Sequence, residues 1–170
     1  DTWQNDCWPT MKNNKMGVFT YAEGVDLFFE QVPAPDREKP WRTVRWGKDL
    51  QFWLPEGRDF RSPNDDPDGP DKTIWGAEQK AWFKESVAAS DATFRILISP
   101  TPIVGPDRDN KQDNHANTSF THEGNELRAF MAAQKNMIVI CGDRHWQYVS
   151  IDPETGLREY CSGPTSDKHA

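Results

Sequence analysis

Two short, almost continuous apolar runs constrain the fold of this chain most. They occupy residues 94–98 and 137–141, and each is far too short to span a membrane. A segment with helical spacing of its apolar residues precedes each run, at residues 77–89 and 123–134. Runs of this kind are typical of strands inside a sheet, buried on both faces. The order helix, strand, helix, strand therefore predicts an α/β fold.

Alternating segments on either side of these runs predict that the sheet is mixed. Residues 41–46 and 50–54 alternate in polarity around Gly47, which suits the tight turn of an antiparallel hairpin. Residues 146–151 and 157–161 form a second alternating pair near the end of the chain. We expect antiparallel strands from these segments to flank the parallel core.

Three segments are expected to lie outside the sheet. Residues 22–31 have the pattern of a short amphipathic helix, and the prolines that follow would end it. Residues 57–75 are rich in turn-forming residues, and no regular element is expected there. The polar segment 100–121 is longer than a plain connection needs, which is typical of a functional loop.

Length and composition limit the class of protein. A chain of 170 residues fits one domain, since domains average about 150 residues. The net charge is −7 and no basic cluster stands out, so a broad nucleic-acid surface is not expected. The aromatic content of 12 % argues against disorder, and the mean hydropathy of −0.87 predicts no membrane span. Three cysteines without a CxxC pair leave one disulfide or three buried thiols open.

The strongest candidate site is the segment Asp143-Arg144-His145, which closely follows the second apolar run. Sites in α/β proteins lie at the carboxyl ends of the strands. The carboxylate of Asp143 and the imidazole of His145 are two residues apart, so both can face one metal ion. Arg144 could neutralise an anionic substrate. The alternative is a turn that ends the strand, with a solvated aspartate.

Two other polar segments could also carry chemistry. His115, in the segment 113–117, can ligate a metal or accept a proton; the alternative is a surface histidine in a turn. Arg58 and Arg61 follow the first hairpin, and their guanidinium groups suit bidentate binding of phosphate or carboxylate. The alternative for the arginines is an ion-pair network that fixes the loop.

Taken together, these segments resemble the PhoD-like alkaline phosphatases of the metallophosphatase superfamily. The similar stretches follow the same order along nearly the whole chain. They are residues 56–64 (EGRDFRSPN), 74–80 (IWGAEQK), 99–106 (SPTPIVGP), 113–117 (DNHAN) and 141–148 (CGDRHWQY).

The resemblance implies a four-layer α/β/β/α sandwich of mixed sheets, with a metal centre at the sheet edges. Members of the family hydrolyse phosphomonoesters or phosphodiesters, often with iron and calcium. They are commonly exported, which implies a periplasmic or extracellular protein. The expected partner is a small phosphate-ester substrate, and the oligomeric state is left open.

The resemblance also assigns metal ligands. Asp143 and His145 take the place of the family's last ligand motif and are expected to bind metal. Asn5 falls near an asparagine-containing stretch of the family, and His115 lies in its Asp-Asn-His loop. Both are expected, on weaker grounds, to be further metal ligands.

Three residues are expected to meet the substrate. Arg58 stands where the family has the arginine of its Asp-x-Arg motif, with Glu56 in place of the aspartate. It is expected to bind the phosphate and to take part in catalysis, and Arg144 is expected to help it. Asn117 is expected to contact the substrate from the Asp-Asn-His loop.

The chain also departs from the family pattern. Asp1 looks like the last acid of an Asp-Asp-His-Asp motif, so the preceding metal ligands and the catalytic histidine are not in this chain. Val149 stands where a histidine is expected. Residues 1–170 are therefore expected to be a single partial domain, inactive by itself. A non-catalytic module that binds calcium or carbohydrate is the alternative, and a preference for monoesters or diesters is left open.

Overall fold

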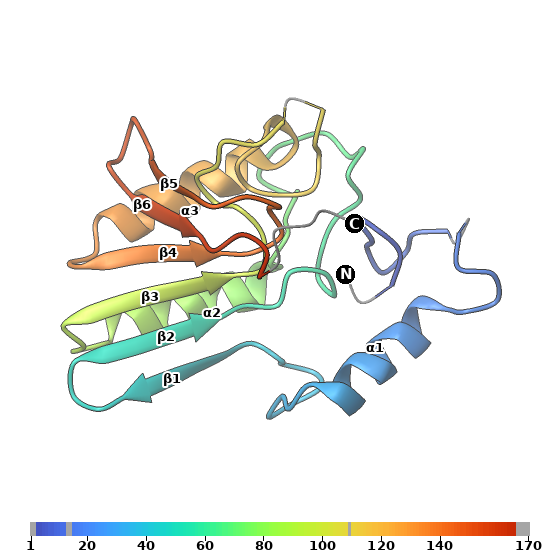
Figure 1. The fold of residues 1–170 in the computed structure, drawn as a ribbon, viewed down its shortest axis with the longest axis horizontal. Coiled ribbons are helices and arrows are strands. Elements are labelled where there is room, and N and C mark those ends of the chain that lie inside the picture. Colours follow the sequence, from blue (N-terminus) through green and yellow to red (C-terminus); the bar gives the residue numbers. More distant parts are fainter. Residues whose placement is uncertain (1–2, 13–14, 109, 166–170) are drawn as a thin grey trace.

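A computed structural model describes residues 3–12, 15–108 and 110–165, and it contains one mixed sheet with three helices (Figure 1). The helices are α1 (Tyr21–Gln31), α2 (Ala77–Ala88) and α3 (Thr121–Ala132), the last preceded by a 3₁₀ turn at Thr118–Phe120. The strands are β1 (Arg42–Trp46), β2 (Leu50–Leu54), β3 (Phe94–Ser99), β4 (Met137–Cys141), β5 (Tyr148–Ile151) and β6 (Arg158–Cys161). The mixed α/β prediction is confirmed. None of the described helices is long and apolar enough to cross a membrane.

The topology of the sheet gathers several loops at one edge. The strand order is β1-β2-β3-β4-β6-β5, with β2, β3, β4 and β6 parallel and β1 and β5 antiparallel at the margins. Ser99, Cys141 and Cys161 lie side by side at the ends of their strands. The loops that follow the parallel strands therefore leave from the same side, which we call the carboxyl edge.

Local sequence explains the hairpin and the first helix. Gly47 adopts a φ of 63° in the turn between β1 and β2, a conformation that glycine reaches without steric cost. Thr20 caps α1: its hydroxyl accepts the N–H of Glu23, whose carboxylate accepts the N–H of Thr20. The hydroxyl of Tyr21 donates to Asp59 over 2.6 Å, which fixes α1 beyond the carboxyl edge (Figure 1).

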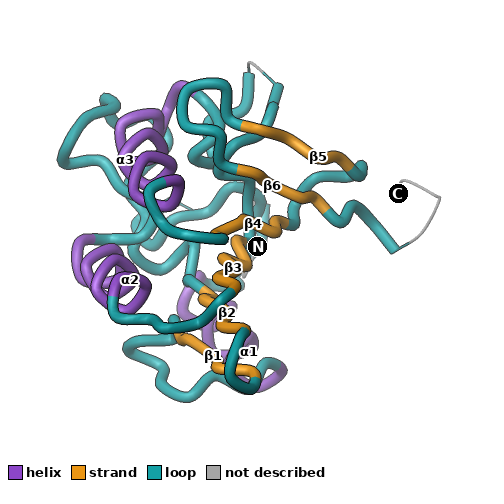
Figure 2. Tube along the Cα trace, turned by 90° about the vertical axis from the view of Figure 1, so that its left-hand side faces the viewer, coloured by secondary structure: helices purple, strands orange, loops and turns teal. Residues whose placement is uncertain are grey.

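Helices α2 and α3 cover one face of the sheet, which we call the closed face (Figure 2). Trp53, Leu97 and Val139 point into this layer from neighbouring strands, and each is fully buried. Phe83 of α2 packs edge-on against Trp53, with ring centroids 6.5 Å apart. Leu127 of α3 completes the cluster. Burial of such large side chains contributes about 1.5–3 kcal/mol each, so this layer is the main source of stability.

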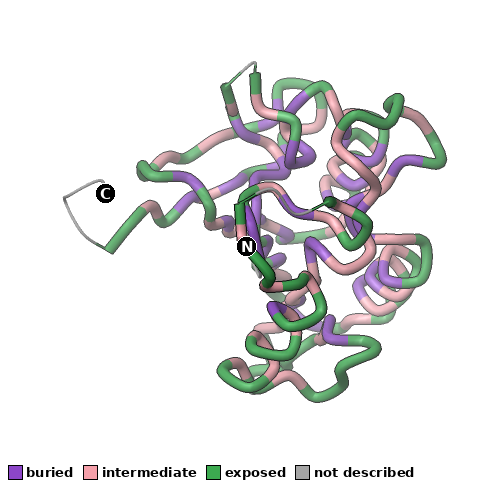
Figure 3. The backbone as a smooth tube through the Cα atoms, turned by 90° about the vertical axis from the view of Figure 1, so that its right-hand side faces the viewer, coloured by how far each residue is buried: buried purple, intermediate pink, exposed green. Residues whose placement is uncertain are grey.

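The other face of the sheet, the open face, is covered by no described element. Phe94 and Ile98 of β3 are 54 % and 37 % exposed, and Val149 and Ile151 of β5 are also exposed. In Figure 3 the buried segments gather in the middle of the molecule, and the outer loops are exposed. The prediction that β3 is buried on both faces is therefore wrong for the described residues. Of the four layers expected from the resemblance, they contain one sheet and one helical layer.

The cysteines match the second of the two alternatives. Cys7, Cys141 and Cys161 are buried free thiols. Burial, together with the charge of Glu159, raises the pKa of Cys141 well above its usual range. A thiol in that state is a poor nucleophile.

Candidate functional site

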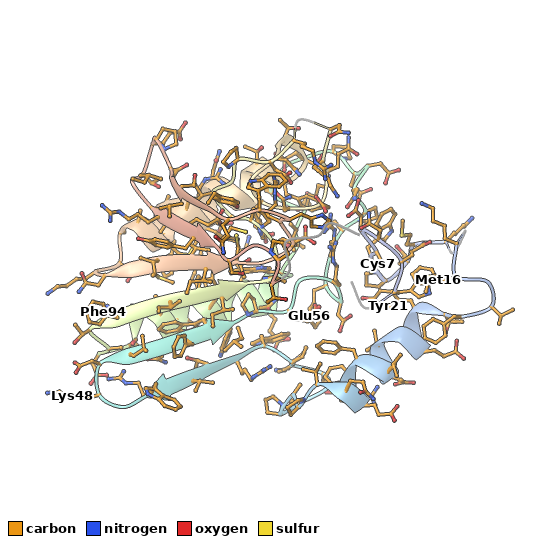
Figure 4. The ribbon with its side chains drawn as sticks, in the orientation of Figure 1. Cys7, Met16, Tyr21, Lys48, Glu56 and Phe94 are labelled. Carbon is orange, nitrogen blue, oxygen red and sulfur yellow. The ribbon has the colours of Figure 1, made fainter. Side chains whose placement is uncertain are left out.

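Two adjoining cavities open at the carboxyl edge, and each has a volume of about 260 Å³. The first, the Asp143 cavity, is lined by Asn5, Asp107, Lys111, Asp143, Arg144 and His145, among others. The second, the Arg58 cavity, is lined by Arg58, Glu56, Arg42, Thr101 and Asp143, with an apolar wall that includes Phe28 and Pro100. Figure 4 shows Glu56 at this end of the sheet, and Lys48 and Phe94 at the opposite end.

Asp143 lines both cavities, and it follows β4 after a single glycine. Its φ is 66°, a left-handed conformation that costs a side-chain-bearing residue free energy. Strain of this kind is found where the surrounding structure must aim a side chain. His145 and Asn5 line the Asp143 cavity too, so three of the four predicted metal ligands meet there. Their role in metal binding stays a prediction.

Arg144 is held in place from two sides. Its guanidinium pairs with the carboxylate of Asp107, and both side chains are almost completely buried. The same guanidinium lies over the ring of Trp146, 3.9 Å from the centroid. The side-chain amide of Asn114 also donates to Asp107, through the carboxylate oxygen that the arginine does not contact. These contacts fix the orientation of the cation in the cavity wall.

The loop after β2 is built around Glu56. Its carboxylate accepts the backbone N–H groups of Arg58 and Asp59 over 2.8 and 2.6 Å, which closes a tight turn. Burial raises the pKa of Glu56 to about 7; the charge of Asp59 adds to the rise, and the hydrogen bonds from backbone N–H groups oppose it. The turn places Arg58 in the cavity wall, only 8 % exposed. A cation in so dry a setting interacts strongly with an anion.

The two arginines predicted to act together have different surroundings in the structure. Arg61 donates to the backbone carbonyls of Asp113 and Gln112, over 2.6 and 3.2 Å, and lies over the ring of Phe120. Burial lowers the pKa of Arg61 to about 10. Its donors therefore fix the loop through backbone carbonyls rather than through the ion pairs of the alternative interpretation, while Arg58 lines the cavity.

His115 and Asn117 are not brought to either cavity. His115 is fully buried: its Nε2 lies 2.9 Å from the carboxylate of Glu123, and its ring packs edge-on against Trp75. Asn117 caps the 3₁₀ turn, where its side chain accepts the N–H of Ser119. Both side chains thus hold the loop against α3.

The carboxylate of Glu123 explains why His115 is buried in the core. Burial raises the pKa of Glu123, but the hydrogen bond and charge of His115 outweigh it, with help from Thr73 and the Ile74 N–H. The result is a pKa of about 2. A carboxylate so buried needs partners of this kind, because an unpaired charge in the core is costly.

Val149 and Asp1 are two residues at which the chain departs from the family pattern, and Val149 lines neither cavity. Val149 lies on β5 and is 65 % exposed on the open face. Asp1 lies outside the described residues.

Asp107 is a site residue that the sequence did not predict. It lies in the long loop after β3, and the only signal was the length of that loop. Its partner Arg144 is 37 positions later in the sequence, so local patterns could not show the pair.

The side chains that line the Asp143 cavity include atoms of the types that bind metal ions. Carboxylate and amide oxygens with one imidazole nitrogen suit iron, and the oxygens suit calcium. Among the described ranges, however, no group of three or more His, Cys, Asp and Glu side chains is arranged so that it could hold a metal ion. Asn5, Asp143 and His145 would therefore supply part of a coordination shell.

Comparisons with known proteins decide the family. The sequence model of the PhoD-like phosphatases matches residues 3–168, almost the whole chain. The chain belongs to the PhoD-like phosphatase family. A solved structure described as "Structure of PhoD" is similar, with a TM-score of 0.77 at 16 % identity. The similarity covers 95 % of this chain and 38 % of that one, and it shows the same fold. A search of curated proteins found no significant match.

Proposed function

We propose that this PhoD-like chain carries the later part of a metal-dependent site that hydrolyses small phosphate esters. One observation carries the proposal: Asp143 lines two adjoining cavities, with His145 in one and the buried Arg58 in the other. A metal ligand and a phosphate-binding cation thus face a shared space. Family membership supports phosphoric-ester hydrolysis as the reaction.

The metal would be held by Asp143 and His145, with Asn5 as a further ligand. Iron and calcium are the proposed metals, as the family resemblance implies. When bound, such ions activate water and neutralise charge on the phosphate.

Arg58 and Arg144 would bind the phosphate oxygens. Phosphoryl transfer depends mostly on positioning and on charge stabilisation, and a fixed guanidinium offers two parallel donors. Arg144 is oriented by Asp107 and Trp146, and Arg58 by the Glu56 turn. Because both side chains are nearly buried, they need little reorganisation when the anion arrives.

The remaining ligands would come from polypeptide outside these residues. The chain spans 38 % of the PhoD chain that it matches, and residues 3–12, 15–108 and 110–165 contain no group of three or more His, Cys, Asp and Glu side chains that could hold a metal ion. We therefore propose that residues 1–170 alone bind metal weakly and turn over little substrate. The longer protein would act on monoesters or diesters, and we propose that it is exported.

Asp143→Ala in the longer protein tests this function. We expect hydrolysis of a chromogenic phosphate ester to fall at least about a hundredfold. The melting temperature should fall by no more than about 5 °C, because Asp143 is exposed and only its left-handed backbone, which suits alanine less well than aspartate, opposes the change. Asp91→Ala is the matched control: it removes an exposed aspartate that pairs with Arg45 near the other end of the sheet. Full activity in Asp143→Ala would contradict the proposal. Measuring kcat/KM for a phosphomonoester and for a phosphodiester would determine which substrate the longer protein prefers.

A further inference from the structure

Glu159 of β6 is a buried carboxylate that the proposed reaction does not use. Its side chain points to the closed face, and the residue is 0 % exposed. The carboxylate accepts the backbone N–H groups of Ile103, Val104 and Gly105, over 2.6, 3.0 and 2.9 Å. It also accepts the hydroxyl of Tyr148 over 2.9 Å. Four donors from two distant segments thus converge on one side chain.

This arrangement ties a loop to a strand in the core. Successive backbone N–H groups form a concave site for an anion, and here the anion is part of the protein. Removing the charge would leave buried donors unsatisfied, which is costly inside a protein. Glu159 therefore fixes the path of residues 103–105 through three directional hydrogen bonds.

The loop held by Glu159 forms walls of both cavities. Pro100 and Thr101, shortly before the held residues, line the Arg58 cavity. Asp107, shortly after them, lines the Asp143 cavity and pairs with Arg144. A shift of the loop would therefore move the carboxylate that orients Arg144.

We propose that Glu159 is a positioning residue for phosphate binding. It holds residues 103–105 so that Asp107 keeps the guanidinium of Arg144 aimed into the Asp143 cavity. The inference rests on the proposed function, in which Arg144 binds the phosphate. It adds a residue that touches neither substrate nor metal and acts through Asp107.

The test uses Glu159→Gln, Asp107→Asn and the double variant in the longer protein. We measure kcat, KM and the inhibition constant of inorganic phosphate. Each single variant should raise the inhibition constant about tenfold, the effect of losing one aligned, charge-assisted contact. Because both act on the same arginine, the double variant should lose no more than the worse single variant.

Glu123→Gln is the matched control. Glu123 is equally buried and also accepts a backbone N–H, that of Ile74 over 2.6 Å, but it holds no residue of either cavity wall. It should lower the melting temperature and leave the inhibition constant of phosphate within about twofold. If Glu159→Gln does not fold, Tyr148→Phe removes one donor and should raise the constant about threefold.

The outcomes separate the two claims. Additive losses in the double variant, or equal effects of Glu159→Gln and Glu123→Gln on phosphate inhibition, would overturn the positioning role alone. A wild-type protein without any phosphatase activity would overturn the proposed function and this inference with it. Non-additive losses confined to the Glu159 and Asp107 variants would support both.

Discussion

His115 and His145 look alike in the sequence and occupy opposite environments in the structure. Both follow an aspartate within two residues, in loops that come after the neighbouring parallel strands β3 and β4. His115 is fully buried against Glu123 and Trp75, whereas His145 is exposed and lines the Asp143 cavity. The difference lies in a distant partner: α3 offers a buried carboxylate to one histidine, and the cavity offers solvent and Asp143 to the other. One histidine packs in the core, and the other lines the cavity where we propose that metal binds.

The largest expected effect comes from His145→Ala, which removes the imidazole from the cavity. Phosphatase activity of the longer protein should fall at least about a hundredfold, since a metal ligand would be lost. The melting temperature should stay within about 2 °C, because the side chain is exposed. Activity assays and thermal melts on one preparation check both points. If His145→Ala unfolds, His145 is a structural residue like His115, and the assignment as a metal ligand is wrong.

His115→Ala should show the opposite pattern. It leaves the carboxylate of Glu123 buried without its main partner, so the free energy of unfolding should fall by about 3–5 kcal/mol. Residual folded protein should keep its phosphate inhibition constant. Denaturant unfolding measures the loss, and an unchanged stability would show that His115 is not a core residue.

Arg58→Lys and Arg61→Lys sharpen the comparison for the arginines. Lysine cannot replace the two parallel donors of a guanidinium. Arg58→Lys should lower kcat/KM about tenfold with little change in stability. Arg61→Lys should instead lower the free energy of unfolding by about 1–3 kcal/mol, since carbonyls of residues 112 and 113 lose their donors. Equal kinetic effects would mean that both arginines meet the substrate.

The smallest effects concern pH, and the two buried carboxyls should act in opposite directions. Glu123 has a folded pKa of about 2 against an ordinary 4.5, so its contribution to stability is present above pH 4.5 and is lost toward pH 2. Glu56 has a folded pKa of about 7, so its contribution is present below pH 4.5 and is lost as pH rises through 7.

Unfolding curves from pH 2 to 8 for Glu123→Gln and Glu56→Gln check this. Glu123→Gln should weaken the dependence of the free energy of unfolding on pH between 2 and 4.5. Glu56→Gln should weaken that dependence between pH 4.5 and 7. A profile that neither substitution alters would contradict the assignment.

The sequence predicted the elements better than the contacts between them. Periodicity placed the hairpin at Gly47 and both apolar strands, because these signals are local. It could not show that Phe94 and Ile98 lie on an open face, since an apolar run does not say what covers it.

Within the site, the same limit holds. The position of Asp143 at the end of a parallel strand was predictable from topology. The burial of His115 and the pairing of Asp107 with Arg144 depend on partners elsewhere in the sequence, so only the folded chain shows them.

A crystal structure of the metal-loaded longer protein with inorganic phosphate would test the central claim most directly. We expect a metal ion about 2.0–2.6 Å from the carboxylate of Asp143 and the imidazole of His145. Phosphate oxygens should lie within hydrogen-bond distance of Arg58 and Arg144. A metal bound at His115, or a phosphate outside both cavities, would contradict the assignment of this edge of the sheet as the phosphatase site.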